Sequence, residues 1–224
     1  MKNASFILSL FLVVSSFGGE WTDLFNGKNL DGWTKKGGAA TYAVENGVIV
    51  GTTKPNTPNT FICPDKQFGD FELTFEVKCD PALNSGVQIR STGSAEGIPA
   101  GTSEKGRKKA MDRVKGGSLY GPQVEIAANG NAGGVWFEAV GGWLLEPKPE
   151  LTKTVYKNND WNSYRILVNG TQIHVWINGV KISDGQETMT KMTRGFLGFQ
   201  VHGIGKRTDT YQVRWKNIKI RELN

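Results

Sequence analysis

The sequence has few of the side chains that usually bind metals or cross-link a chain. Its 224 residues include two cysteines, Cys63 and Cys79, and two histidines, His174 and His202. A structural zinc site usually takes four such ligands at close spacing, so a typical zinc site is excluded. The turn expected at 64–69 places Cys63 at the start of the next strand, about 30 Å from Cys79 at roughly 3.3 Å per residue. We therefore expect two free, partly buried cysteines.

Long apolar runs are also scarce. Residues 6–14 form the longest one, and they are too few to cross a bilayer, which takes about 20 apolar residues. Lys2 precedes this run and small residues at 16–18 follow it, as in a secretory signal peptide. We therefore expect residues 1–18 to be a signal peptide. The protein is then exported, to a periplasm or outside the cell, and is not inserted in a membrane.

Several common functional motifs are missing. No glycine-rich loop leads from a strand into a helix, which argues against a nucleotide cofactor, and no serine has the setting of a nucleophile elbow. The net charge is +6, but basic residues are concentrated only in 105–115. A nucleic-acid surface needs a denser basic stripe with stacking aromatics. We expect no nucleic-acid partner.

What the chain does have is a strong strand pattern. Phe71, Leu73, Phe75 and Val77 alternate with polar residues over 70–78, which predicts a strand with an ordinary solvated outer face. Asn-Gly pairs at 46–47, 169–170 and 178–179 are typical of type I′ hairpin turns. The segment 164–183 is therefore expected to be a three-stranded meander.

Many short strands and 29 glycines favour an all-β fold, a sandwich or jelly roll of two antiparallel sheets. Residues 19–224 have a length that suits a single domain of this kind. One segment, 93–118, is polar, glycine-rich and basic, with no core pattern. A loop of this length is usually functional or disordered. It is either a lid over a site or an insertion without a role.

Several strands carry unusual polar residues opposite an apolar face. Over 198–203, Phe199 and Val201 point to one side while Gln200 and His202 point to the other. The same alternation is expected to turn these further residues away from the core: Gln88, Arg90, Gln123, Glu125, Trp136, Glu138, His174, Trp176 and Asn178.

If three of these strands share one sheet, a groove combines a carboxylate, an imidazole, a guanidinium, amides and an indole. Such groups suit a sugar, because they bind hydroxyls, stack on a ring and transfer protons. The alternative is a solvated face, where Lys, Glu and Thr are more usual. His174 and Trp176 also fit an ordinary surface pair.

The motifs resemble the 3-keto-disaccharide hydrolase family along essentially the whole mature chain. They occupy residues 21–33, 68–73, 84–90, 123–126, 160–165, 176–179, 198–203 and 215–223. The resemblance implies an exported bacterial protein with a concanavalin A-like jelly-roll fold. It also implies cleavage of glycosides that another enzyme has already oxidised at C3.

Ordinary glucanase chemistry is not expected. Retaining β-glucanases of this fold carry Glu-x-Asp-x-x-Glu on one strand, whereas residues 123–128 place an amide at Gln123 and a methyl group at Ala128. Displacement by two carboxylates is then unavailable. A 3-keto sugar can be cleaved by a different reaction. Its ketone acidifies the C2 proton, so one base can eliminate the C1 leaving group, and water then adds back.

The resemblance and the residues together suggest roles. Glu125 and His202 are the expected base and acid, in an order left open. Arg90 or a bound divalent metal ion is expected to stabilise the enolate. Substrate-binding candidates are Gln123, Gln200 and Gln88 for hydroxyls and Trp136 for stacking, with Trp143 as a second aromatic. The alternatives are a carbohydrate-binding module without catalysis, or a structural envelope protein.

Overall fold

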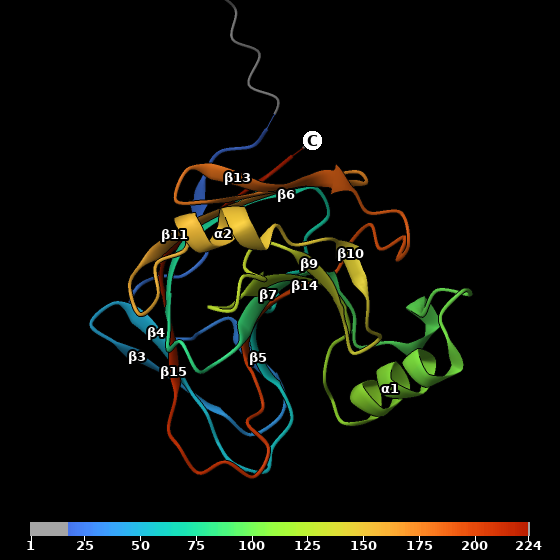
Figure 1. Cartoon of the computed structure of the whole chain (residues 1–224), viewed down its shortest axis with the longest axis horizontal. Coiled ribbons are helices and arrows are strands. Elements are labelled where there is room, and N and C mark those ends of the chain that lie inside the picture. The colour runs from blue at the N-terminus through green and yellow to red at the C-terminus, as the bar shows by residue number, and fades with distance from the viewer. Residues whose placement is uncertain (1–17, 224) are drawn as a thin grey trace, which may run out of the picture.

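Two antiparallel β-sheets packed face to face form the body of the protein (Figure 1). The computed structural model describes residues 18–223. The order in sheet A is β13 (Val180–Gln186), β12 (Gln172–Ile177), β11 (Asn162–Asn169), β6 (Phe71–Cys79), β15 (Gln212–Glu222), β4 (Val48–Thr52) and β3 (Thr41–Glu45), and β1 (Thr22–Asp23) pairs with β15.

The order in sheet B is β10 (Trp143–Leu145), β9 (Val135–Glu138), β8 (Gly121–Ile126), β7 (Ser85–Ser91), β14 (Phe196–Val201), β5 (Thr60–Pro64) and β2 (Trp33–Gly37). The predicted all-β jelly-roll sandwich is confirmed. The predicted signal peptide lies outside the described residues except for Gly18.

The core lies between the inner faces of the two sheets. Phe71, Leu73, Phe75 and Val77 of β6 are all buried, which confirms the predicted alternation. The ring of Phe75 stacks on Tyr164 within sheet A and meets the edge of Phe199 in sheet B, with centroid distances of 5.2 and 5.9 Å.

The outer face of β6 is not simply solvated. Glu72 is only 1% exposed, because Arg165 of β11 and Arg221 of β15 both donate to its carboxylate. The polar side of this strand therefore holds three strands together through one buried carboxylate. The alternation of apolar and polar residues did not predict this buried carboxylate.

The hairpins agree with the Asn-Gly pattern at two of the three positions. Asn46 and Asn178 have φ of 50° and 49°, and the glycine after each also has positive φ. At the third position Asn169 pairs with Gln172, so the turn consists of Gly170 and Thr171. The meander of β11, β12 and β13 forms as predicted.

Both cysteines are free, as predicted, and they are more fully buried than expected. Cys63 lies on β5 of sheet B and Cys79 on β6 of sheet A. Burial raises the pKa of each thiol to about 12, so neither is an activated nucleophile.

The segment 93–118 is more ordered than its sequence suggested. It contains the short 3-10 helix η1 (Ala95–Gly97) and the helix α1 (Glu104–Lys115). Ala110 of α1 is buried in a small apolar cluster with Tyr120 and Phe137, although the sequence of the segment shows no core pattern.

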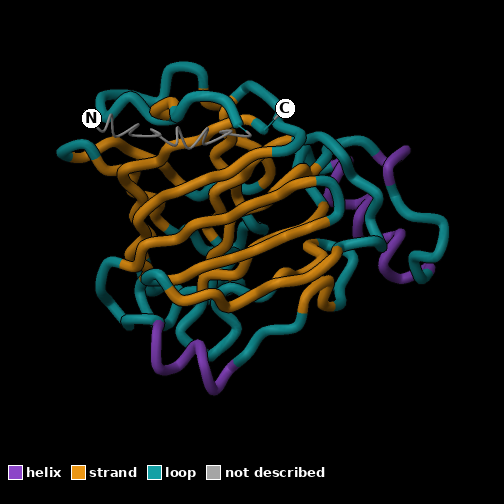
Figure 2. The backbone as a smooth tube through the Cα atoms, turned by 90° about the horizontal axis from the view of Figure 1, so that it is seen from above, coloured by secondary structure: helices purple, strands orange, loops and turns teal. Residues whose placement is uncertain are grey.

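A third helix, α2 (Pro149–Val155), completes the helical elements among residues 18–223. Figure 2 shows the helices at the periphery of the strands. Within this described part of the chain, no helix is both long enough and apolar enough to cross a membrane.

Candidate active site

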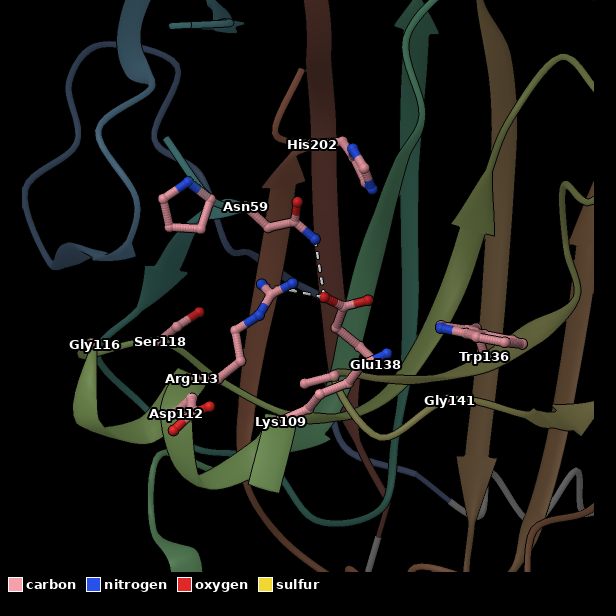
Figure 3. A pocket seen from close by; sticks show the side chains of 12 residues that line it. Asn59, Lys109, Asp112, Arg113, Gly116, Ser118, Trp136, Glu138, Gly141 and His202 are labelled. Atoms are coloured by element: carbon pink, nitrogen blue, oxygen red, sulfur yellow. Dashed lines mark hydrogen bonds and ion pairs between the residues drawn. The ribbon is translucent and has the colours of Figure 1, made fainter. Parts of the chain in front are cut away.

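A pocket of about 440 Å³ lies between the outer face of sheet B and α1 (Figure 3). The outer face carries the side chains that alternate with the core residues. The pocket is lined by Pro58, Asn59, Lys109, Asp112, Arg113, Gly116, Ser118, Trp136, Glu138, Ala139, Gly141 and His202. The segment predicted as a possible lid therefore forms one wall of this pocket, through α1.

Glu138, at the end of β9, is the carboxylate of this pocket. Its Oε1 accepts a hydrogen bond from Asn59 Nδ2 at 2.9 Å and lies 3.4 Å from Nη1 of Arg113. Asn59 Oδ1 in turn accepts from the backbone N–H of Gly203 at 2.9 Å. Asn59 thus connects Glu138 to the residue that follows His202.

His202 follows the last residue of β14, and Figure 3 shows its ring facing the same open space as Glu138. Its Nδ1 lies 2.7 Å from the carbonyl oxygen of Gly203. A carbonyl can only accept, so this contact places a hydrogen on Nδ1. Nε2 is then the nitrogen that can exchange a proton with a ligand.

Trp136 supplies the aromatic surface of the pocket. It lies directly opposite Gln123 on the neighbouring strand β8. Trp143 packs edge-on against it, with a centroid distance of 5.0 Å and an angle of 72° between the rings. Of the two predicted aromatics, Trp136 lines the pocket, and Trp143 supports Trp136 from β10.

Glu125 lies on the same face of sheet B but is only 6% exposed and is not among the residues that line the pocket. Its Oε1 accepts from Gln123 Nε2 at 2.7 Å and its Oε2 from Asn84 Nδ2 at 2.9 Å. Burial raises the pKa of Glu125 to about 7, against the effect of these two donors, and the charge of Glu138 adds to the increase.

The three predicted glutamines are buried together on this face. Gln200 Nε2 donates to Gln123 Oε1 at 2.9 Å, so this contact is made within the protein and not with the pocket, while Gln200 Oε1 is buried without a hydrogen-bond partner among the described residues. Gln88 is fully buried, and its amide has no hydrogen-bond partner within residues 18–223.

Arg90 is not at the site, contrary to the prediction from alternation. Its guanidinium pairs with Asp70 and donates to the carbonyl oxygens of Gly69 and Gly170, at 2.7 and 2.6 Å. The strand pairing shifts here, since Phe196 and Gly198 of β14 face Ser91 and Gln88, and Arg90 has φ of +52°. This β-bulge reverses the alternation, so Arg90 cannot serve the pocket.

His174 and Trp176 also lie elsewhere. They are on β12 of sheet A, where His174 Nδ1 is 2.7 Å from Asp184 and the guanidinium of Arg165 covers the ring of Trp176 at 4.2 Å. They form an ordinary surface pair, which was the alternative to a place in the sugar-binding groove.

Of the twelve lining residues, only Trp136 and His202 were site candidates, and the missed polar residues are Asn59, Lys109, Asp112, Arg113, Ser118 and Glu138. Alternation with Phe137 already turned Glu138 outward, so its signal was present. Asn59 precedes a strand, and Arg113 and Ser118 belong to a segment with no strand pattern. Their places depend on how that segment folds back over sheet B.

The donor set does not fit a metal centre. Within the part of the chain that is described, no three His, Cys, Asp or Glu side chains are grouped so as to hold an ion. We therefore derive no chemical step through a metal.

The family model of the 3-keto-alpha-glucoside-1,2-lyase-like domain matches residues 20–221. The chain belongs to this family. The match confirms the resemblance drawn from the sequence motifs. No curated protein matches this 3-keto-alpha-glucoside-1,2-lyase-like chain significantly.

Several solved structures with this fold are described as glycosyl hydrolases or carbohydrate-binding modules. A candidate glycosyl hydrolase from Parabacteroides distasonis ATCC 8503 is 23% identical, with a TM-score of 0.60, over 92% of this chain and 94% of that one. A structure described as a native glycosidic hydrolase is 15% identical, with a TM-score of 0.58, over 92% and 95%. The carbohydrate-binding module CBM66 from Bacillus subtilis is 13% identical, with a TM-score of 0.55, over 84% and 94%. At these identities the likeness establishes the fold.

Proposed function

We propose that this protein cleaves 3-keto glycosides, including 3-keto disaccharides, by elimination across C1 and C2 followed by hydration. The observation that carries the proposal is the pocket that brings an imidazole, a carboxylate, a guanidinium and an indole together on sheet B. Membership of the 3-keto-alpha-glucoside-1,2-lyase-like family supports the choice of substrate. We also propose that residues 1–18 direct export.

In the proposed reaction a base removes the proton on C2, which the neighbouring ketone makes acidic. The electron pair is held as an enolate, the C1–O bond breaks, and an acid protonates the departing oxygen. Water then adds across the new C1–C2 double bond. The sum is hydrolysis without a covalent enzyme intermediate, so no nucleophilic carboxylate is required.

Glu125 and His202 remain our proposed acid and base. A carboxyl group with a pKa of about 7 can gain or lose a proton at neutral pH, and His202 lines the pocket with its Nδ1 already engaged by Gly203, which leaves Nε2 for proton transfer. Glu138 is the rival carboxylate, because it lines the pocket itself.

Arg113 replaces Arg90 as the cation proposed to stabilise the enolate. Its guanidinium lines the pocket, and Nη1 is buried without a hydrogen bond in the described structure, although it pairs electrostatically with Glu138. Trp136 is proposed to stack on the sugar ring.

The test is to incubate the purified protein with 3-keto-trehalose or a 3-keto-glucoside, with and without chelator, and to follow sugar release by mass spectrometry. The unoxidised sugars are the control. Cleavage of the oxidised sugars alone supports the proposal, and the chelator arm reports on metal dependence. Glu125→Gln and Glu138→Gln then compare the two carboxylates, and full turnover by Glu125→Gln contradicts its role.

A binding module without catalysis is the second candidate, favoured by the fold shared with CBM66. It predicts sugar binding with no release from either the oxidised or the unoxidised substrates. Binding of this kind changes little when Glu125 is replaced by Gln, since no proton is transferred.

A further inference from the structure

A buried hydrogen-bonded chain beside the pocket connects two strands of sheet B, β14 and β8, across β7, which lies between them. It runs from Gln200 on β14 to Gln123 on β8 and from there to Glu125, with N–O distances of 2.9 and 2.7 Å. Both glutamines are at most 1% exposed. The orientation of the Gln123 amide is set by this chain, because its oxygen accepts from Gln200 and its nitrogen donates to Glu125.

Gly86 makes this chain possible. It lies on β7, between β8 and β14, and pairs directly with Glu125. A Cβ atom at Gly86 would lie 2.7 Å from both Cγ and Cδ of Gln123. The Gln123 side chain therefore crosses β7 through the space that the missing side chain leaves, and any larger residue at this position would push it away.

The contacts of Glu125 act in opposite directions. Burial and the charge of Glu138 on β9 favour the neutral carboxyl, whereas the amide donors of Gln123 and Asn84 favour the carboxylate. From β11, Tyr164 donates only to the backbone oxygen of Glu125, at 3.4 Å. On the neighbouring strand β7, the residue paired with Glu125 is Gly86, which has no charged side chain. The two amides are therefore the main groups that make ionisation of Glu125 possible.

We propose that Gln123 is a positioning residue, held by Gln200 across the gap at Gly86, which fixes one oxygen of Glu125 and favours its ionised form. The proposal deepens the proposed function and rests on it for its catalytic meaning, because it explains how a buried carboxyl group can release a proton. Gln123 is thus assigned to Glu125 and not to a substrate hydroxyl.

The experiment follows the titration of the Glu125 carboxyl group directly, by 13C NMR of glutamate-labelled full-length protein, with Glu125→Gln to assign the signal. We compare wild type, Gln123→Met, and Gln88→Met as a matched control. Gln88 lies directly opposite Gln123 on β7, is equally buried, and its side chain makes no hydrogen bond within residues 18–223, so this variant changes the packing beside Gln123 without removing a donor to Glu125. Gln123→Met is expected to raise the pKa of Glu125 by about one unit or more, because one donor to the charged form is lost. Gln88→Met is expected to leave it unchanged.

An unchanged Glu125 titration in Gln123→Met overturns the proposal, even if the variant is less stable. Gly86→Ala provides a second route should Gln123→Met fail to fold. It keeps every polar group but displaces Gln123, so it should raise the same pKa, and a titration like that of wild type also overturns the proposal.

The pH–rate profile then relates the titration to the proposed reaction. The limb that reports Glu125 should move with the NMR titration in Gln123→Met and stay in place in Gln88→Met. If the titration moves but wild type cleaves no 3-keto sugar, the positioning role stands and the proposed function fails. If wild type cleaves the sugar but the Glu125 titration is unchanged in Gln123→Met, the proposed function stands and the positioning role fails.

Discussion

Glu125 and Glu138 lie on neighbouring strands of sheet B in different surroundings. Glu125 is buried, its carboxyl oxygens accept from the side-chain amides of Gln123 and Asn84, and burial raises its pKa to about 7. Glu138 faces the pocket and has a cation, Arg113, beside it. Two carboxyl groups held in such different settings can take different parts in a proton-transfer reaction.

The raised pKa of Glu125 predicts how stability depends on pH. The folded protein holds this proton up to about pH 7, whereas the unfolded chain releases it near pH 4.5. The contribution to the free energy of unfolding is therefore fully present below pH 4.5 and is lost as the pH rises through 7. The loss is on the order of 3 kcal/mol.

Urea denaturation at pH 5 and pH 8 measures this effect. Glu125→Gln cannot ionise, so it should lose less stability than wild type between the two pH values. Equal losses in the two proteins would show that the Glu125 proton is not held as described.

At the scale of elements, α1 is the one that completes the pocket. Its N-cap is Ser103, whose hydroxyl accepts from the backbone N–H of Gly106 at 3.2 Å, and Gly116 is its C-cap. These two residues are ordinary helix boundary signals. The helix was missed because it has little apolar character, with only Ala110 and Gly106 buried.

Removal of this cap should loosen α1 without unfolding the sheets. Ser103→Ala is expected to weaken the helix by about 1 kcal/mol, because one N–H loses its partner. Hydrogen exchange of residues 104–115 should become faster while the melting temperature stays nearly constant, since α1 packs in a cluster apart from the main core. Lys105→Ala, on the exposed side, is the control and should leave the exchange unchanged.

The bulge in β7 is a second feature of an element that could not be predicted from the sequence. Alternation placed Gln88 correctly but failed two residues later at Arg90, where the bulge reverses the side chains. Nothing in residues 84–90 marks the bulge, because it arises from the pairing with β14.

At the scale of the whole molecule, the hydroxyl group of Tyr42 helps to connect the two sheets. Tyr42 of β3 in sheet A contacts the carbonyl oxygens of Thr60 and Phe199 at 2.8 Å and accepts from the N–H of Val201 at 3.1 Å, all in sheet B. Burial raises the pKa of Tyr42 well above its ordinary value, so this hydroxyl stays neutral.

Tyr42→Phe should therefore lower the free energy of unfolding by about 1–3 kcal/mol, because the Val201 N–H loses its partner inside the protein. Denaturant unfolding measures the change. Tyr211→Phe is the matched control, since its hydroxyl makes no hydrogen bond within residues 18–223, and it should change stability little. Equal effects of the two substitutions would mean that the connection between the sheets contributes nothing.

The local order of residues was enough to predict several of the strands, among them β6, β8 and the meander, together with two of the three hairpin turns, the free cysteines and the outward direction of Gln88, Gln123, Glu125, Gln200 and Trp136. These features depend on the period of a strand and on turn chemistry, which act over a few residues. Family membership could also be predicted from motifs along the chain, and the family match confirmed it.

Only the tertiary structure decided which of these residues share a pocket. Asn59 and Glu138 are 79 positions apart in sequence but are joined by a hydrogen bond. Arg113 lines the pocket because α1 packs over sheet B. Arg90 does not line it, because the pairing of β7 with β14 contains a bulge. Contacts between residues so far apart in the sequence depend on how the whole chain packs, and a pattern of neighbouring residues cannot predict them.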